Sequence, residues 1–116
     1  VGDDIGAQQV LHDLVGNGHR LILFTMRSEI NYLDDAVAWF QEQGISLYGV
    51  QSHPEQKSWT ASPKAYGELI IDDTMLGAKL VDGRYLNWQW AAEMLCERGL
   101  ITPEQLAAYD FRLYVY

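Results

Sequence analysis

Cysteine and basic residues are scarce in this chain of 116 residues. Its one cysteine, Cys96, has no second cysteine with which to form an internal disulfide, as is usual for proteins of reducing compartments. The sequence has 8 Lys and Arg residues against 16 Asp and Glu residues, which gives a formal net charge of −8 at pH 7. Because such a surface repels anionic polymers and anionic lipids, the composition argues against nucleic-acid and membrane partners.

Long apolar runs are also missing. No stretch approaches the ~18 residues of a membrane span, and the first residues do not have the basic-then-apolar pattern of a secretory leader. Neither a P-loop nor a Gly-x-Gly-x-x-Gly fingerprint is present. With 48% hydrophobic and 21% charged residues, the composition is that of a globular protein. We therefore expect a cytoplasmic protein with a single domain over residues 1–116.

Short apolar runs alternate with amphipathic segments along the chain. The pattern predicts strands at 21–24, 45–50 and 69–71, and helices at 7–15, 32–43, 88–98 and from Thr102 onward. Strands that are apolar on both faces are typical of parallel sheets covered by helices. The predicted fold class is therefore α/β, with a doubly wound (Rossmann-like) parallel sheet. The aromatic tail 111–116 is predicted as a terminal edge strand.

Asp72-Asp73 is the sharpest polar feature of the sequence. The pair directly follows the apolar run 69–71, and two adjacent carboxylates are most stable beside a cation. Their hard oxygen ligands favour Mg²⁺ over zinc, because the three histidines show no metal-ligand spacing. An Asp-Asp pair is equally common as turn chemistry at the end of a strand, and the dipeptide alone leaves both interpretations open.

Two further positions could bind phosphate. Thr25 follows the run 21–24, where a strand-end hydroxyl and neighbouring backbone N–H groups can hold phosphoryl oxygens, and Arg27 could supply charge. Lys64 precedes the acidic pair by a few residues and could offset a carboxylate while binding phosphate. Taken singly, Thr25 is a common strand-end residue and Lys64 a common surface lysine.

Three segments together resemble motifs of the haloacid dehalogenase-like (HAD) superfamily of hydrolases. The segments 21–27 (LILFTMR), 62–67 (SPKAYG) and 69–77 (LIIDDTMLG) are similar, in order and spacing, to its second, third and fourth motifs. The resemblance is closest to small, nearly cap-free members and extends from Ile5 to about Leu100. It implies a HAD-like three-layer sandwich.

The resemblance also implies roles for individual residues. Thr25 would hydrogen-bond the transferring phosphoryl group, the backbone around Met26 and Arg27 would complete the phosphate cradle, and Lys64 would stabilise the developing charge. Asp72 would bind Mg²⁺ directly. Asp73 would bind it through water or orient the coordination shell of the metal.

The family's first motif is missing from the sequence. That motif is an apolar strand ending in Asp-x-Asp, which supplies the aspartyl nucleophile and the general acid/base, whereas Asp3 and Asp4 follow only Val1-Gly2. In the family this strand is central in the sheet. We therefore expect about 20 residues before Val1, enough for one strand of ~5–6 residues and a loop. The alternative is a domain that repacks or borrows a strand from a partner.

The leading hypothesis is a Mg²⁺-dependent phosphohydrolase that acts on a small phosphorylated molecule through an aspartyl-phosphate, with the nucleophile N-terminal to Val1. The alternative is a catalytically incomplete HAD-like scaffold that binds metal or phosphate without turnover. A phosphoacceptor receiver domain is disfavoured, because its acidic pair would come near the start of the fold. The loop 51–63, with Trp59, is long enough to shape a pocket. Substrate identity and oligomeric state are left open.

Overall fold

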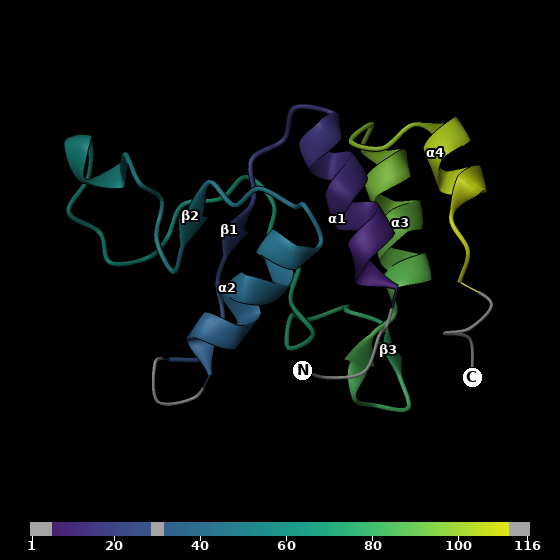
Figure 1. Cartoon of the computed structure of the whole chain (residues 1–116), viewed down its shortest axis with the longest axis horizontal. Coiled ribbons are helices and arrows are strands. Elements are labelled where there is room, and N and C mark those ends of the chain that lie inside the picture. The colour runs from purple at the N-terminus through teal and green to yellow at the C-terminus, as the bar shows by residue number, and fades with distance from the viewer. Residues whose placement is uncertain (1–5, 29–31, 112–116) are drawn as a thin grey trace. The chain divides into compact units, whose positions relative to one another are not determined.

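The computed structural model describes residues 6–28 and 32–111, and Figure 1 labels most of its helices and strands. The described residues belong to two compact units: Arg20–Leu69, and a second made of residues 6–19 together with 70–111. Among them, no helix has both the length and the apolar character needed to cross a lipid bilayer.

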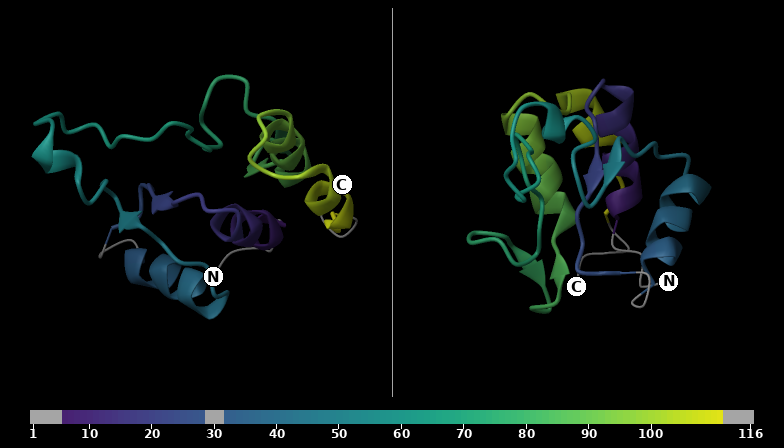
Figure 2. Two further views of the ribbon diagram at one scale, coloured as in Figure 1. Left: turned by 90° about the horizontal axis from the view of Figure 1, so that it is seen from above. Right: turned by 90° about the vertical axis from the view of Figure 1, so that its left-hand side faces the viewer.

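A short pair of parallel strands organises the first unit. β1 (Ile22–Leu23) pairs with β2 (Gly49–Val50), with Ile22 opposite Gly49 and Leu23 opposite Val50, and the two lie side by side in Figures 1 and 2. Parallel neighbours need a crossover connection, and α2 (Leu33–Glu42) lies in it. The helix predicted at 32–43 is thereby confirmed.

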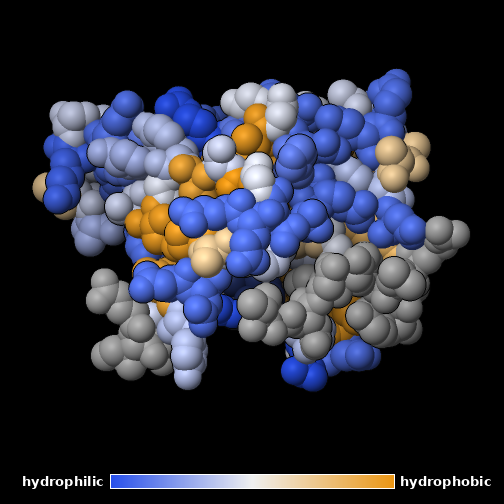
Figure 3. All heavy atoms as spheres, in the orientation of Figure 1, coloured by the Kyte–Doolittle hydropathy of each residue, from blue (hydrophilic) through white to orange (hydrophobic). Residues whose placement is uncertain are grey.

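The strands of this unit are shorter and more exposed than the sequence predicts. β1 and β2 have two residues each, although strands were expected over all of 21–24 and 45–50. Next to them, Phe24 is 62% exposed and Val50 is 36% exposed. Figure 3 shows apolar surface in orange over β1 and β2. The run 21–24 is therefore not buried on both faces.

Beyond β2 the first unit continues as a long loop. Its one regular element is the short 3₁₀ helix η1 (Gln56–Ser58), and Figure 2 shows the chain leading out from β2 to this turn and back. The side chain of Gln56 is buried within this loop. The segment predicted as a loop at 51–63 is confirmed.

Helices build the core of the second unit. They are α1 (Ala7–Gly16), α3 (Trp88–Glu97) and α4 (Pro103–Ala108). The hairpin β3 (Leu80–Val81) and β4 (Tyr85–Leu86) precedes α3 and turns at Asp82 and Gly83, both with positive φ. The buried apolar side chains of this unit are Val10, Leu14, Leu86, Trp88, Ala91, Ala92, Leu95, Ile101 and Phe111.

The helix caps follow the sequence signals closely. Asn87 caps α3, its Oδ1 accepting from the Trp90 N–H at 3.0 Å. Thr102 begins α4 with a capping box, in which its Oγ1 accepts from the Gln105 N–H at 3.1 Å and Gln105 Oε1 accepts from the Thr102 N–H at 3.0 Å. These caps bind end N–H groups that otherwise lack a partner in the helix. Both predicted helix starts are confirmed.

The predicted fold class is wrong. The part of the chain that the structure describes contains two sheets of two strands each, one parallel and one antiparallel. This is neither a doubly wound, Rossmann-like parallel sheet nor a HAD-like three-layer sandwich with one central strand missing.

The run 69–71, expected as a buried strand, is irregular, and its side chains are exposed by 39, 42 and 37%. A strand needs a hydrogen-bonding neighbour, and this run pairs with none of the described strands. Of the predicted edge strand 111–116, residues 112–116 lie outside the described residues.

Tyr109, just after α4, carries a strained polar group. Its hydroxyl is buried and has no hydrogen-bond partner among the described residues. Burial, followed by the carboxylate of Asp13, raises the pKa of Tyr109, because both disfavour the phenolate. Because the pKa of Tyr109 is raised in the folded state, its contribution to the free energy of unfolding is constant below the unfolded pKa of about 10. As the pH rises beyond that value, the free energy of unfolding falls.

The variant Tyr109→Phe should therefore unfold at the same or a higher denaturant concentration near neutral pH. The expected gain is up to about 1 kcal/mol, since an unsatisfied hydroxyl is removed. The gain should widen at alkaline pH, near pH ~11, where the wild-type tyrosine must ionise on unfolding. Urea unfolding at both pH values measures it, with Tyr32→Phe, whose side chain is 70% exposed, as the control. A less stable variant near neutral pH would mean that the hydroxyl is bonded in solution.

Candidate functional site

The loop that follows β1 is held by a glutamine side chain from the end of β2. Gln51 Oε1 accepts from the Thr25 N–H at 2.9 Å, and Gln51 Nε2 donates to the carbonyl oxygens of Thr25 at 2.7 Å and Arg27 at 3.0 Å. Thr25 Oγ1 also accepts from the Arg27 N–H at 3.2 Å. The loop 25–27 is thus bonded at both ends by one amide group.

These bonds decide which groups of the loop can meet a ligand. The N–H groups of Thr25 and Arg27 donate to Gln51 Oε1 and Thr25 Oγ1, and the phosphate cradle around Met26 and Arg27 stays a prediction. The hydroxyl hydrogen of Thr25, which is half-buried, and the guanidinium of exposed Arg27 are side-chain donors that a ligand could meet. The guanidinium also makes a long contact of 3.4 Å with the Tyr32 carbonyl.

A second glutamine organises the loop that contains Lys64. Gln56 is only 7% exposed. Its Nε2 donates to the carbonyl oxygens of Ser62 at 3.0 Å and Lys64 at 2.6 Å, and its Oε1 accepts from the Tyr66 N–H at 2.8 Å. The backbone of Lys64 is therefore fixed, while its side chain is exposed. Lys64 thus places a cation on a rigid loop of the same unit as Thr25.

Asp72 and Asp73 lie in the second unit, on a turn rather than at the end of a strand. Asp72 Oδ1 accepts from the Thr74 N–H at 2.9 Å and from Thr74 Oγ1 at 3.0 Å, and the Met75 N–H donates to the Asp72 carbonyl at 3.3 Å. This is the turn chemistry that the sequence left open beside the metal interpretation.

The two carboxylates influence each other. The bonds from Thr74 hold the pKa of Asp72 below its ordinary value. The pKa of Asp73 is raised, first by its hydrogen bond with Asp72 and then by burial and the Asp72 charge. The two shifts have opposite signs, as expected for adjacent carboxyl groups that repel each other when both are charged.

The donor set of this turn fits a hard divalent cation that keeps much of its water. Among residues 6–28 and 32–111, no group of three or more His, Cys, Asp or Glu side chains gathers into a potential metal site. Mg²⁺, however, is commonly bound by one or two carboxylates with water and substrate phosphate completing its shell. Asp72 and Asp73 can supply such oxygens.

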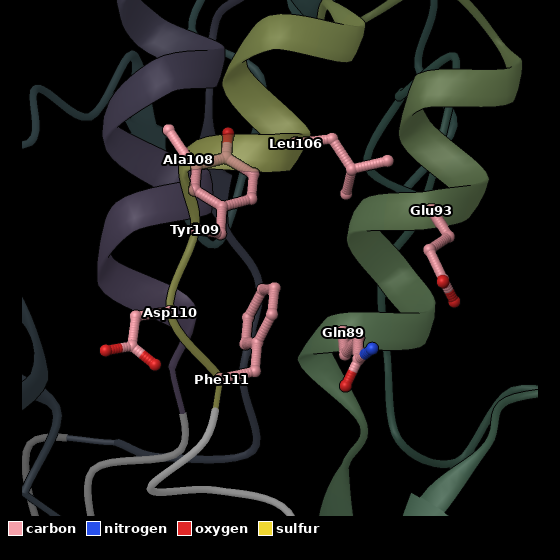
Figure 4. A pocket seen from close by; sticks show the side chains of 7 residues that line it. All are labelled: Gln89, Glu93, Leu106, Ala108, Tyr109, Asp110 and Phe111. Carbon is pink, nitrogen blue, oxygen red and sulfur yellow. The ribbon is translucent and has the colours of Figure 1, made fainter.

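A shallow hollow in the second unit offers different chemistry. Tyr109 and Phe111, which follow α4, face Gln89 and Glu93 of α3 across it (Figure 4). Its charged lining side chains, Glu93 and Asp110, are both acidic. A phosphorylated ligand would be repelled there, so this hollow is not the candidate site.

Sequence patterns did not indicate the two glutamines. Gln51 and Gln56 lie in a segment predicted only as a loop, and glutamine is usually a surface residue. The one local sign at Gln51 is its positive φ of 65°, which a sequence does not display.

Comparisons with protein families, with curated proteins and with solved structures found no match to this chain.

Proposed function

We propose that this chain carries the metal- and phosphate-binding residues of a Mg²⁺-dependent phosphohydrolase related to the HAD superfamily. The observation that carries the proposal is the pair of adjacent, solvent-accessible carboxylates Asp72 and Asp73, whose like charges repel each other and whose turn is held by Thr74. Binding a divalent cation would relieve this repulsion. The order of Thr25, Lys64 and the acidic pair along the chain, which resembles that of HAD hydrolases, supports the same reaction.

The acidic pair would hold the cation. Asp72 would bind Mg²⁺ directly through the carboxylate oxygen that Thr74 does not occupy, and Asp73 would bind it directly or through water. Bound Mg²⁺ would supply charge stabilisation to the phosphoryl oxygens. A net charge of −8 makes such a local positive charge necessary for an anionic substrate.

Three side chains would bind the phosphate. Thr25 would donate its hydroxyl hydrogen to a phosphoryl oxygen, and Lys64 would place its ammonium against the developing negative charge. Arg27 would add a guanidinium, whose fork geometry suits phosphate. Gln51 and Gln56 would act as positioning residues, because they fix the backbone of Thr25 and Lys64.

The proposed reaction needs an aspartyl nucleophile, which we take to lie N-terminal to Val1 in the natural protein. Its carboxylate would attack phosphorus, form an aspartyl-phosphate and release the alcohol of a small phosphate ester. Water would then hydrolyse the acyl phosphate and release inorganic phosphate.

The test is phosphate release from p-nitrophenyl phosphate by the intact natural protein, with Mg²⁺ or with EDTA. We expect turnover with Mg²⁺ and a loss of at least about 100-fold with EDTA, as for the removal of a catalytic metal. Restoring Mg²⁺ should restore turnover, which separates metal removal from denaturation.

The absence of any Mg²⁺-dependent release from the intact protein would reject the proposal. If calorimetry then detected Mg²⁺ or inorganic phosphate binding without turnover, the chain would be a scaffold that binds these ions.

A further inference from the structure

The loop with Lys64 also carries a cluster of aromatic rings. The rings of Trp59 and Tyr66 lie 5.4 Å apart at 89°, and the His53 ring lies 5.9 Å from Trp59 and 6.1 Å from Tyr66. Tyr48 packs behind His53 at 5.3 Å. We call Trp59 and Tyr66 the aromatic pair.

Both rings of the aromatic pair are exposed to solvent. Trp59 is 54% exposed and Tyr66 is 48% exposed. Apolar area that stays in water gives up the free energy that its burial would contribute. Single exposed apolar residues are common, but two adjacent aromatic rings on one loop are typical of a surface that binds a ligand.

The pair is also pre-organised. The Trp59 N–H donates to the Gln56 carbonyl at 3.1 Å, and the Tyr66 N–H donates to Gln56 Oε1 at 2.8 Å. Both bonds go to Gln56, which is buried. The backbone of Trp59 and the backbone of Tyr66 are therefore held by the same residue. A ligand ring that stacks on one of the two would spend little free energy on ordering the loop.

Gln56 also holds the backbone of Lys64, a cationic residue. Gln56 Nε2 donates to the Lys64 carbonyl at 2.6 Å, so the backbone of Lys64 is fixed beside that of Tyr66, and its side chain is exposed. Exposed flat rings together with an ammonium group suit a ligand that has a flat ring at one end and an anion at the other.

We propose that Trp59 and Tyr66 bind the flat ring of a phosphorylated aromatic compound, in the manner of a nucleoside 5′-monophosphate, while Lys64 binds its phosphate. The inference deepens the proposed function, on which it rests, by naming the substrate class of the phosphohydrolase. Nucleic-acid polymers are a different class, and the net charge of −8 repels them.

The test compares two probes, of which only one carries an aromatic base. Adenosine 5′-monophosphate and ribose 5-phosphate are titrated by calorimetry into the intact protein in EDTA, where binding is measured without turnover. We expect adenosine 5′-monophosphate to bind about tenfold more tightly, because stacking of one base contributes roughly that much.

Variants of Trp59 assign that difference to the aromatic pair. Trp59→Leu should weaken adenosine 5′-monophosphate binding about tenfold and leave ribose 5-phosphate unchanged. Trp59→Phe keeps an aromatic face and is the matched control, so it should retain most of the tenfold preference. Because Trp59 is 54% exposed, neither change should unfold the loop, and circular dichroism checks this.

Equal affinity for the two probes, or the same preference in Trp59→Leu, would overturn the inference. If p-nitrophenyl phosphate is still hydrolysed with Mg²⁺ in that case, the proposed function stands without it. Conversely, a Trp59-dependent preference without hydrolysis would support the binding site and reject the phosphohydrolase.

Discussion

Replacing Asp72 by asparagine is expected to lower Mg²⁺-dependent phosphate release by the intact protein at least about 100-fold. Changes to residues that only orient a metal ligand already cost about 10- to 100-fold, and Asp72 is the proposed direct ligand. The substitution removes one negative charge from the pair and leaves an amide that binds Mg²⁺ weakly.

The fold of the turn should survive this change. Asparagine retains an Oδ1 that can accept from the Thr74 N–H and hydroxyl, which are the bonds Asp72 makes now. A drop in activity would then report metal binding rather than unfolding. Thermal unfolding without Mg²⁺ should accordingly differ little between the two proteins.

Asp82→Asn is the matched control. Asp82 is exposed in the β3–β4 turn with φ 53°, a conformation that asparagine adopts readily. The same chemical change at this position should leave phosphate release within about twofold of the wild type, since surface substitutions are usually near-neutral. Equal losses in both variants would point to net charge instead of a metal ligand, and an active Asp72→Asn variant would remove Asp72 from the proposed site.

The variant Gln56→Leu is expected to destabilise the first unit by about 3 kcal/mol. Leucine is similar in size but cannot bond the carbonyls of Ser62 and Lys64 or the N–H of Tyr66. Each buried polar group left without a partner costs about 1–3 kcal/mol, and the lower end applies because these groups are partly buried. Urea unfolding followed by tryptophan fluorescence measures the loss.

Gln9→Leu is the comparison for this loss. Gln9 makes a similar amide clamp, donating to the Asp110 carbonyl at 3.2 Å and accepting from its N–H at 3.2 Å, but at an exposed position. Water can replace those bonds, so the cost should be below about 1 kcal/mol. If both variants lose equally little, the Gln56 bonds are not structural, and the Lys64 loop is not pre-organised in the way proposed for phosphate binding.

Local signals predicted the helices of the second unit well. Helices were predicted at 7–15, at 88–98 and from Thr102 onward, and α1 and α3 end within one residue of those bounds, with Asn87 capping α3 and Thr102 capping α4. Capping and turn formation involve residues a few positions apart, so a sequence displays them directly. The amphipathic pattern predicted both α1 and α3, whose buried side chains include Val10 and Leu14 in α1 and Ala91 and Leu95 in α3.

The same reasoning failed for the sheet. An apolar run such as 69–71 has the composition of a strand, but it becomes one only beside a partner. In this structure that run is irregular and partly exposed, so Asp72 and Asp73 follow a coil and form a turn. The interpretation as turn chemistry thus describes their local structure, while their role in binding Mg²⁺ is a proposal.

The sequence by itself determined the acidic character of this protein, its capped helices and the candidate residues Thr25, Lys64, Asp72 and Asp73. Only the tertiary structure decided how the backbone of Thr25 and that of Lys64 are held. Gln51 reaches Thr25 across a separation of 26 residues, and Gln56 collects Ser62, Lys64 and Tyr66 around one buried amide. The physical reason is that these bonds depend on chain segments meeting in space, whereas caps and helix faces depend on neighbours along the chain.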